Sequence, residues 1–160
     1  MFIPGHGATA GRGAPEFKLK LLTYLFCKTF ILQFFAGEAD FVPATKSADG
    51  DPLDVLVLMD EPTFPGCMLD CMLIGVIEAE QEEQGTMVRN DRLIAVATQS
   101  LRYADVKHIR DLNETILKQI EAFFVNYRKL RNVELRILGR RGPEGALEIL
   151  RKAVEQKHAA

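Results

Sequence analysis

The segment DGDPLDVLVL at 49–58 places three carboxylates directly before an apolar run. Asp49 and Asp51 are two residues apart, so in an extended chain their side chains point to the same side, about 6.6 Å apart. Pro52 disfavours a helical conformation at Asp51, and the resulting turn lets Asp54 converge on the same space. Three like charges in a partly buried cleft are unfavourable unless a cation lies among them. The pattern therefore predicts a site for a hard divalent cation such as Mg²⁺, Mn²⁺ or Ca²⁺.

A plainer interpretation of this segment stays open, in which the aspartates cap backbone groups of a solvated turn. An EF-hand loop is disfavoured, because it needs Gly at its sixth position and Glu at its twelfth, where Asp54 and Asp60 stand. Phosphatases with an aspartyl nucleophile carry an apolar strand before their acidic pair, whereas here the apolar run follows it.

The composition is that of one globular domain: 160 residues, 48% of them apolar, with a formal net charge of −2. That charge offers no general attraction to nucleic acid or to an anionic membrane. Three cysteines without a disulfide framework indicate reduced thiols and a cytoplasmic protein. We expect a flexible, Gly/Pro-rich tail at 1–15 and a single domain at 16–157.

The pattern from 17 to 97 predicts mainly β-strands, with a hairpin-type connection around the charged segment QEEQG at 81–85. After 105 the apolar residues recur at helical spacing, and Asp111 with Glu114 suits a capping box for the first helix. A short strand, VELRILG, precedes a last helix that opens at Pro143. Strands first and helices last predict an α+β fold, a small closed or half-closed β-barrel with helices packed outside.

The acidic segment also carries a resemblance. Asp-Gly-Asp-Pro-Leu-Asp followed by an apolar strand resembles the signature of the family I (soluble) inorganic pyrophosphatases. DEPTFPG, GVIEAEQ, RNDRLIAVA and IEAFFVNYRKL are similar to successive segments of a bacterial branch, in the same order, over roughly 41–152. The resemblance implies a five-stranded OB-like barrel with flanking helices, two of them C-terminal. It also implies Mg²⁺-dependent hydrolysis of inorganic diphosphate to two phosphates, with Mn²⁺ as a substitute, by a homo-oligomer.

The resemblance assigns roles to the three aspartates. Asp49 and Asp54 match the family's metal ligands, and Asp51 matches the residue that activates the attacking water. In the family a metal-bound hydroxide attacks phosphorus in line. Divalent ions would thus offset the repulsion among the carboxylates and supply a nucleophile near neutral pH.

Three further residues match positions that bind phosphate. Tyr127 and Arg128 stand where the family has a Tyr-Lys pair, and Arg92 stands where it has a lysine. Arginine keeps the charge, although its planar fork reaches differently. Without the resemblance, Tyr127 would be a core aromatic with a wet hydroxyl, and Arg92 an ordinary solvated charge.

Two more metal-binding aspartates of the family have no clear match. Counting from RLIAV, one falls on Asn90, with Asp91 shifted by one residue. Counting from GVIEA, the other falls on Gln81, with Glu82 shifted by one. We predict Asp91 and Glu82 as the candidate metal ligands. The alternative is that the charged segment is only a solvated acidic turn.

The resemblance to the family is weaker toward the N-terminus. FAGEADF at 35–41 keeps only the end aromatics of a family segment, and the family's Lys-x-Glu pair falls on Glu16 to Lys18 with reversed charges. An alternative function is therefore a catalytically impaired relative that serves as a binding or assembly subunit. A nucleic-acid-binding OB barrel is a weaker alternative, because the balance of charge is acidic.

Overall fold

The computed structural model describes residues 18–22, 37–42, 45–47, 51–61 and 68–158. The predicted tail at 1–15 and the candidate ligand Asp49 lie outside these residues, so both remain predictions. Within the described part, no helix is long and apolar enough to cross a membrane.

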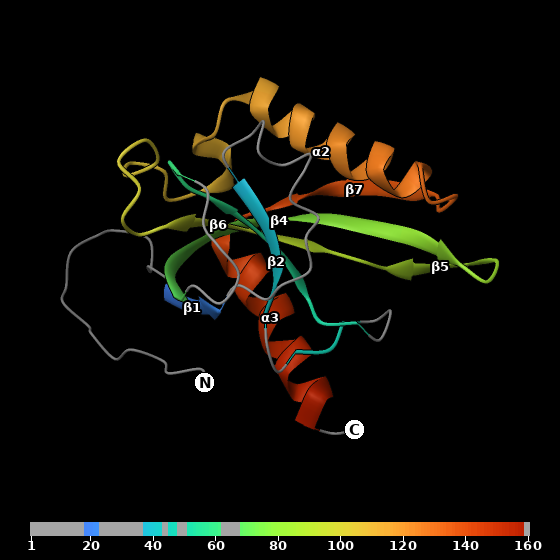
Figure 1. Ribbon diagram of the computed structural model, residues 1–160. Coiled ribbons are helices and arrows are strands. Elements are labelled where there is room, and N and C mark those ends of the chain that lie inside the picture. Colours follow the sequence, from blue (N-terminus) through green and yellow to red (C-terminus); the bar gives the residue numbers. More distant parts are fainter. Residues whose placement is uncertain (1–17, 23–36, 43–44, 48–50, 62–67, 159–160) are drawn as a thin grey trace.

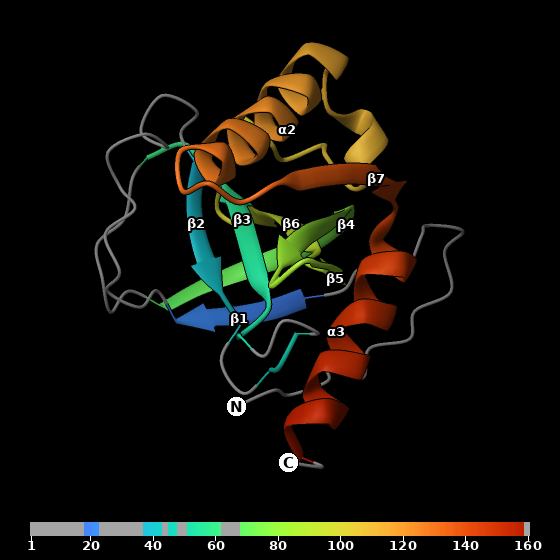
Figure 2. The same cartoon turned by 90° about the vertical axis from the view of Figure 1, so that its right-hand side faces the viewer.

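Among the described residues, seven strands form one sheet, in which five make up the main path β1-β4-β6-β3-β2, while β5 and β7 pair with β4. The strands β3 and β6 are parallel, and the other pairs are antiparallel. The strands are β1 Lys18–Leu22, β2 Gly37–Phe41, β3 Asp54–Leu58, β4 Met68–Glu83, β5 Thr86–Arg89, β6 Arg92–Ala97 and β7 Leu135–Arg141. A 3₁₀ turn, η2 (Ile109–Asp111), precedes the helices α2 (Glu114–Lys129) and α3 (Pro143–His158). Figures 1 and 2 show α2 and α3 on opposite sides of the sheet.

The predicted α+β class, the five-strand path and the two C-terminal helices are confirmed. The expected closure into a barrel is not seen among the described strands, since no pairing joins β2 back to β1 or β7. The described strands therefore form an open sheet, with β1 and β2 at the ends of its main path.

A β-bulge in β4 divides the apolar side chains between two cores. Leu73 pairs with Ala95 and Gly75 pairs with Ile94, so Ile74 is an extra residue. Because side chains alternate along a strand, the extra residue moves the odd-numbered positions after it to the other face. Cys71, Leu73 and Val76 pack in the core that includes the α3 residues Ala146, Leu147, Leu150 and Ala153. Ile74, Ile77 and Ala79 pack in the core that includes the α2 residues Leu117, Ile120 and Phe124.

The predicted hairpin is confirmed, but its turn is shorter than the charged segment suggested. Residues 81–83 still belong to β4, and only Gln84 and Gly85 make the turn, with φ of 51° and 80°. Positive φ at both central residues is typical of the turn that joins two strands closely. The last three acidic and amide residues of β4 therefore have fixed faces, which matters for the site below.

The helix that begins at Glu114 is capped by Asn113, whose side chain accepts a hydrogen bond from the Thr115 N–H. The prediction of a capping box that starts at Asp111 was wrong for this helix. Asp111 instead completes a capping box with His108 around η2, because the chain makes a separate 3₁₀ turn first. Pro143 opens α3 as predicted.

Candidate functional site

Hydrogen bonds hold the chain that leads into β3. The Leu53 N–H donates to Thr45 Oγ1 over 3.0 Å, and that hydroxyl donates to the Val42 carbonyl over 2.5 Å. The Ser47 N–H donates to the carbonyl of Asp51 over 2.7 Å. These bonds hold the backbone at Asp51, and the residue itself is exposed to solvent. A side chain that contacts a bound ligand needs such exposure.

Asp54 and Arg92 open neighbouring parallel strands and lie opposite each other in the register. Arg92 Nη1 is 2.9 Å from Asp54 Oδ2; the Arg92 side chain is 4% exposed and the Asp54 side chain 36%. The pair thus joins a buried cation to a carboxylate that still reaches solvent. The sequence predicted that both belong to the site, and the structure brings them together.

The Arg92 guanidinium has further acceptors. Its Nη1 donates to the Asn90 side-chain oxygen and lies 3.3 Å and 3.2 Å from the carbonyls of Asn90 and Asp91. Its central carbon is 5.6 Å from the centre of the Phe124 ring on α2, within the range of a cation–π contact. A buried charge needs such partners, so Arg92 is a fixed part of the structure and not the solvated charge that its sequence position alone suggested.

Asn90 and Gln81 are buried, with 2% and 4% of their surface exposed. Gln81 has the same parity as Ile77 and Ala79, after the bulge, and so belongs to the α2 side of β4. Asn90 turns its oxygen toward Arg92, which leaves its Nδ2 buried without a hydrogen-bond partner among the described residues. The unsatisfied atom is an N–H donor, and a donor does not coordinate a metal ion.

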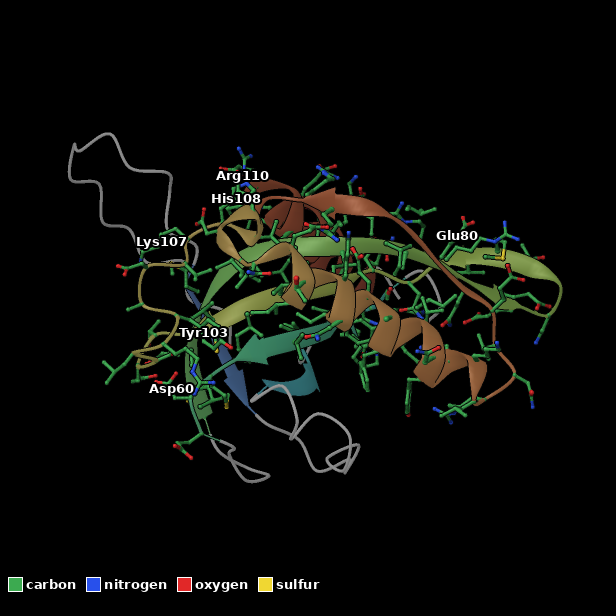
Figure 3. All side chains as sticks on the ribbon, turned by 90° about the horizontal axis from the view of Figure 1, so that it is seen from above. Asp60, Glu80, Tyr103, Lys107, His108 and Arg110 are labelled. Carbon is green, nitrogen blue, oxygen red and sulfur yellow. The ribbon has the colours of Figure 1, made fainter. Side chains whose placement is uncertain are left out.

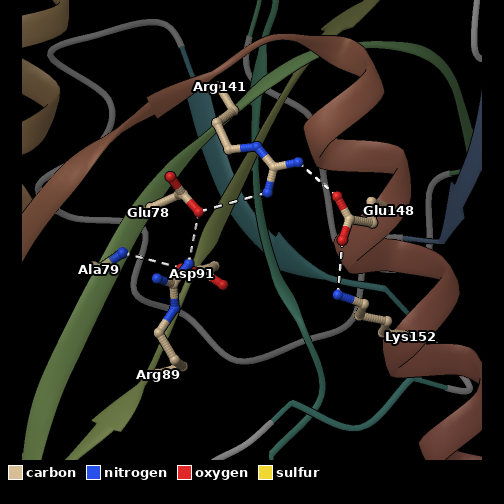
Figure 4. A network of polar contacts seen from close by, with 7 residues as sticks. All are labelled: Glu78, Ala79, Arg89, Asp91, Arg141, Glu148 and Lys152. Atoms are coloured by element: carbon tan, nitrogen blue, oxygen red, sulfur yellow. Dashed lines mark hydrogen bonds and ion pairs between the residues drawn. The ribbon is translucent and has the colours of Figure 1, made fainter.

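Asp91 takes part in a polar network on the side of α3 (Figure 4). Its Oδ1 accepts from the Ala79 N–H over 3.1 Å and from Arg89 over 2.7 Å. Arg89 also binds Glu78 over 2.9 Å. Burial opposes the charge of Arg89, yet its hydrogen bonds with Glu78 and Asp91 raise the pKa of the guanidinium. The structure therefore does not bring Asp91 to Asp54.

The same network continues to α3. Arg141 lies 3.7 Å from Glu78 and 2.6 Å from Glu148, and Lys152 lies 2.7 Å from Glu148 (Figure 4). These contacts tie β4 and β7 to α3. They give Asp91 a structural role that its sequence position did not suggest.

Glu82, the other candidate ligand, is exposed near the end of β4 and has the parity of Glu78, opposite to that of Gln81. The structure does not bring it to Asp54 either. Within the described residues, no group of three or more His, Cys, Asp or Glu side chains is arranged to hold a metal ion.

Tyr127 and Arg128 follow Phe124 by three and four residues on α2, so they share its side of the helix one turn further on. Both are half-buried. The Tyr127 ring stacks on Phe123, with centroids 5.9 Å apart and an interplanar angle of 23°. This packing restrains the Tyr127 ring.

A second carboxylate is well bound at the other end of β3. Asp60 accepts from Ser100 Oγ over 2.6 Å and from the Leu101 N–H over 2.7 Å. The hydrogen bond from Ser100, followed by that from Leu101, lowers the pKa of Asp60. Figure 3 shows Asp60 beside Tyr103 and far from Glu80, which lies toward the β4–β5 hairpin. Asp60 therefore anchors a loop and is not part of the site at Asp54.

Fold and site together define an α+β domain of the OB-like kind, with an acidic segment and a buried arginine at the openings of two parallel strands. The family model "Inorganic pyrophosphatase" matches residues 27–158, and the chain belongs to this family.

Curated relatives and solved structures agree with the family model. The inorganic pyrophosphatase of Picrophilus torridus is 32% identical over 118 residues, which cover 74% of this chain and 64% of the relative. That of Halalkalibacterium halodurans is 34% identical over 124 residues, 76% of this chain and 72% of the relative. The solved structure of the Helicobacter pylori inorganic pyrophosphatase is 31% identical, with a TM-score of 0.69, and the match covers 78% of this chain and 72% of that one.

Proposed function

We propose that the chain hydrolyses inorganic diphosphate to two phosphates with Mg²⁺ as its cofactor. One observation carries the proposal: in a chain of the inorganic pyrophosphatase family, the Asp-Gly-Asp-Pro-Leu-Asp segment ends at Asp54, which is ion-paired with the buried Arg92 at the opening of β3. The pair offers both signs of charge, as needed by a substrate that is an anion accompanied by cations.

The carboxylates of the acidic segment fit Mg²⁺, whereas the opposite side of the site does not. Asp51 and Asp54 present hard carboxylate oxygens, one exposed and one partly exposed, and these fit Mg²⁺ or its substitute Mn²⁺. The side of the site at Asn90 fits poorly, because its oxygen is bound to Arg92 and its other terminal atom is an N–H donor. When bound, Mg²⁺ would lower the pKa of a water molecule and neutralise phosphate oxygens.

Each side chain then has a part in the reaction. Asp51, which is exposed to solvent, accepts the proton of an attacking water that lies within hydrogen-bond reach of its carboxylate. The Tyr127 hydroxyl donates to a phosphate oxygen, and Arg128 supplies a positive charge beside it. Arg92 holds Asp54, and Asp49 adds a carboxylate from the same segment.

Phosphate release from diphosphate with Mg²⁺ tests this function. Asp51→Asn keeps the size of the side chain and removes its basicity, so we expect kcat to fall by about 10²–10⁴-fold. Asp60→Asn is the matched control, because Asp60 anchors a loop at the other end of β3. Equal activity of wild type and Asp51→Asn would refute the assignment of the base.

A second candidate function is supported by the amides at Gln81 and Asn90. In this candidate the chain is an impaired relative that acts as a binding or assembly subunit. The same assay separates the two, since a folded wild-type chain that releases no phosphate with either Mg²⁺ or Mn²⁺ favours the second. We also propose that the chain forms a homo-oligomer, which light scattering after size-exclusion chromatography would detect as a mass above 17.9 kDa.

A further inference from the structure

The charge at the openings of β3 and β6 is arranged around Arg92. Its guanidinium lies 2.9 Å from Asp54 Oδ2 and donates to the side-chain oxygen of Asn90. Phe124 lies against it at 5.6 Å, and only 4% of the side chain is exposed. A divalent cation that approaches Asp54 therefore meets a positive charge already bound to one of its oxygens.

Asn90 strengthens this arrangement. As a neutral amide it adds no negative charge beside Arg92, and its oxygen is taken by the guanidinium. Its Nδ2 is a buried N–H donor without a hydrogen-bond partner among the described residues. Neither terminal atom of Asn90 is therefore suited to a metal ion, because the oxygen is bound to Arg92 and the nitrogen is a donor.

We propose that Arg92 is a built-in cation that fills the Asn90 side of the site and competes with divalent ions for Asp54. The inference rests on the proposed function, because that function places a divalent ion at Asp54. Arg92 acts as a positioning residue, and its charge sets how tightly the carboxylates hold the metal ion. The chain thus binds divalent ions more weakly at Asp54 than the same carboxylates would without Arg92.

The test measures Mn²⁺ affinity in the absence of diphosphate, by calorimetry or by the electron paramagnetic resonance signal of free Mn²⁺ at low ionic strength. Arg92→Met removes the charge, and Arg92→Gln removes it but keeps hydrogen-bonding groups. We expect both to bind Mn²⁺ about tenfold more tightly, since a neighbouring positive charge no longer repels the ion. Arg92→Lys keeps the charge and should stay within about threefold of wild type.

Arg136→Met is the matched control. It removes the same charge from an exposed arginine of β7 that pairs with Glu134. Unchanged or weaker Mn²⁺ binding in the two neutral Arg92 variants would overturn the proposal, and so would an equal gain in Arg136→Met. A purely structural role for Arg92 predicts unfolding without tighter binding.

Thermal unfolding shows whether each variant is folded. If neither neutral variant folds, Asn90→Leu gives the answer, because it removes the amide oxygen that shares Arg92 with Asp54 and adds no metal ligand. Weaker Mn²⁺ binding by Asn90→Leu supports the proposal, and unchanged or tighter binding overturns it. The titration contains no substrate, so a chain that releases no phosphate refutes the proposed function without affecting this result.

Discussion

Gly75 stands at the β4 bulge, where a side chain has no space. A Cβ at this position would lie 2.7 Å from the Arg141 carbonyl oxygen, and 2.7 Å and 2.9 Å from two carbons of Ile109. Favourable carbon contacts lie near 3.5–4.0 Å, so Gly75→Ala forces either the β7 backbone or the η2 turn to move. Overpacking of a well-packed core costs about 1–3 kcal/mol, and we expect about 3 kcal/mol here because one of the clashing atoms belongs to the backbone.

Gly139 offers the same substitution without the clash. It lies in β7 opposite Glu78, and nothing lies within 4 Å of its added Cβ. We expect Gly139→Ala to change the free energy of unfolding by less than about 1 kcal/mol.

Urea unfolding compares the two variants. With a denaturant slope of about 2 kcal/mol/M, the Gly75→Ala midpoint should fall by about 1.5 M while the Gly139→Ala midpoint stays near wild type. Equal midpoints for the two variants would refute the argument that the bulge requires glycine. The comparison bears on function as well, because the bulge decides which side chains of β4 face α2.

Two further predictions concern the surface network and the support of the site. A hydrogen bond from Lys152, and a second one from Arg141, lower the pKa of Glu148 from 4.5 to about 2. A lowered folded-state pKa stabilises the fold above about pH 4.5, and the contribution is lost as the pH falls toward 2. At low salt, the melting temperature should therefore fall less between pH 6 and pH 2.5 in the Glu148→Gln variant than in wild type. An equal fall in both proteins would contradict this reasoning. Phe124→Leu removes the ring beside Arg92, so the free energy of unfolding in urea should fall by about 1–2 kcal/mol. Phe123 is only half-buried, so Phe123→Leu should lower it by less.

Periodicity was sufficient for the helices and for most of the strands. The helical spacing after 105 corresponds to α2, and Pro143 marked the start of α3 because its fixed φ suits a first helical turn. The apolar run after Asp54 is β3, buried on both faces between the two cores. The capping residue of α2 was missed, since Asn113 and Asp111 are both good caps and only the separate turn η2 decides between them.

The polar part of the site was harder to predict, because it depends on strand parity. Motif spacing left Asn90 and Asp91 as alternatives for one position, and Gln81 and Glu82 for another. Charge favoured the acidic member of each pair. Strand parity instead places the amides on the α2 face, where Asn90 binds Arg92, whereas Asp91, which is also buried, is bound by Arg89 on the side of α3.

The reason lies in the single extra residue Ile74. A strict two-residue alternation from Leu73 onward would give Gln81 the face of Leu73, in the core with α3, and would turn Glu82 toward α2. The bulge reverses this assignment, and no local feature of the sequence except Gly75 marks it. The cation partner of Asp54 comes from the register of β3 and β6, in which Arg92 lies opposite Asp54, as much as from the acidic segment itself. The bulge acts on the neighbouring strand β4, so a substitution that removes it should turn Glu82 in place of Gln81 toward α2 even though it touches none of the site residues.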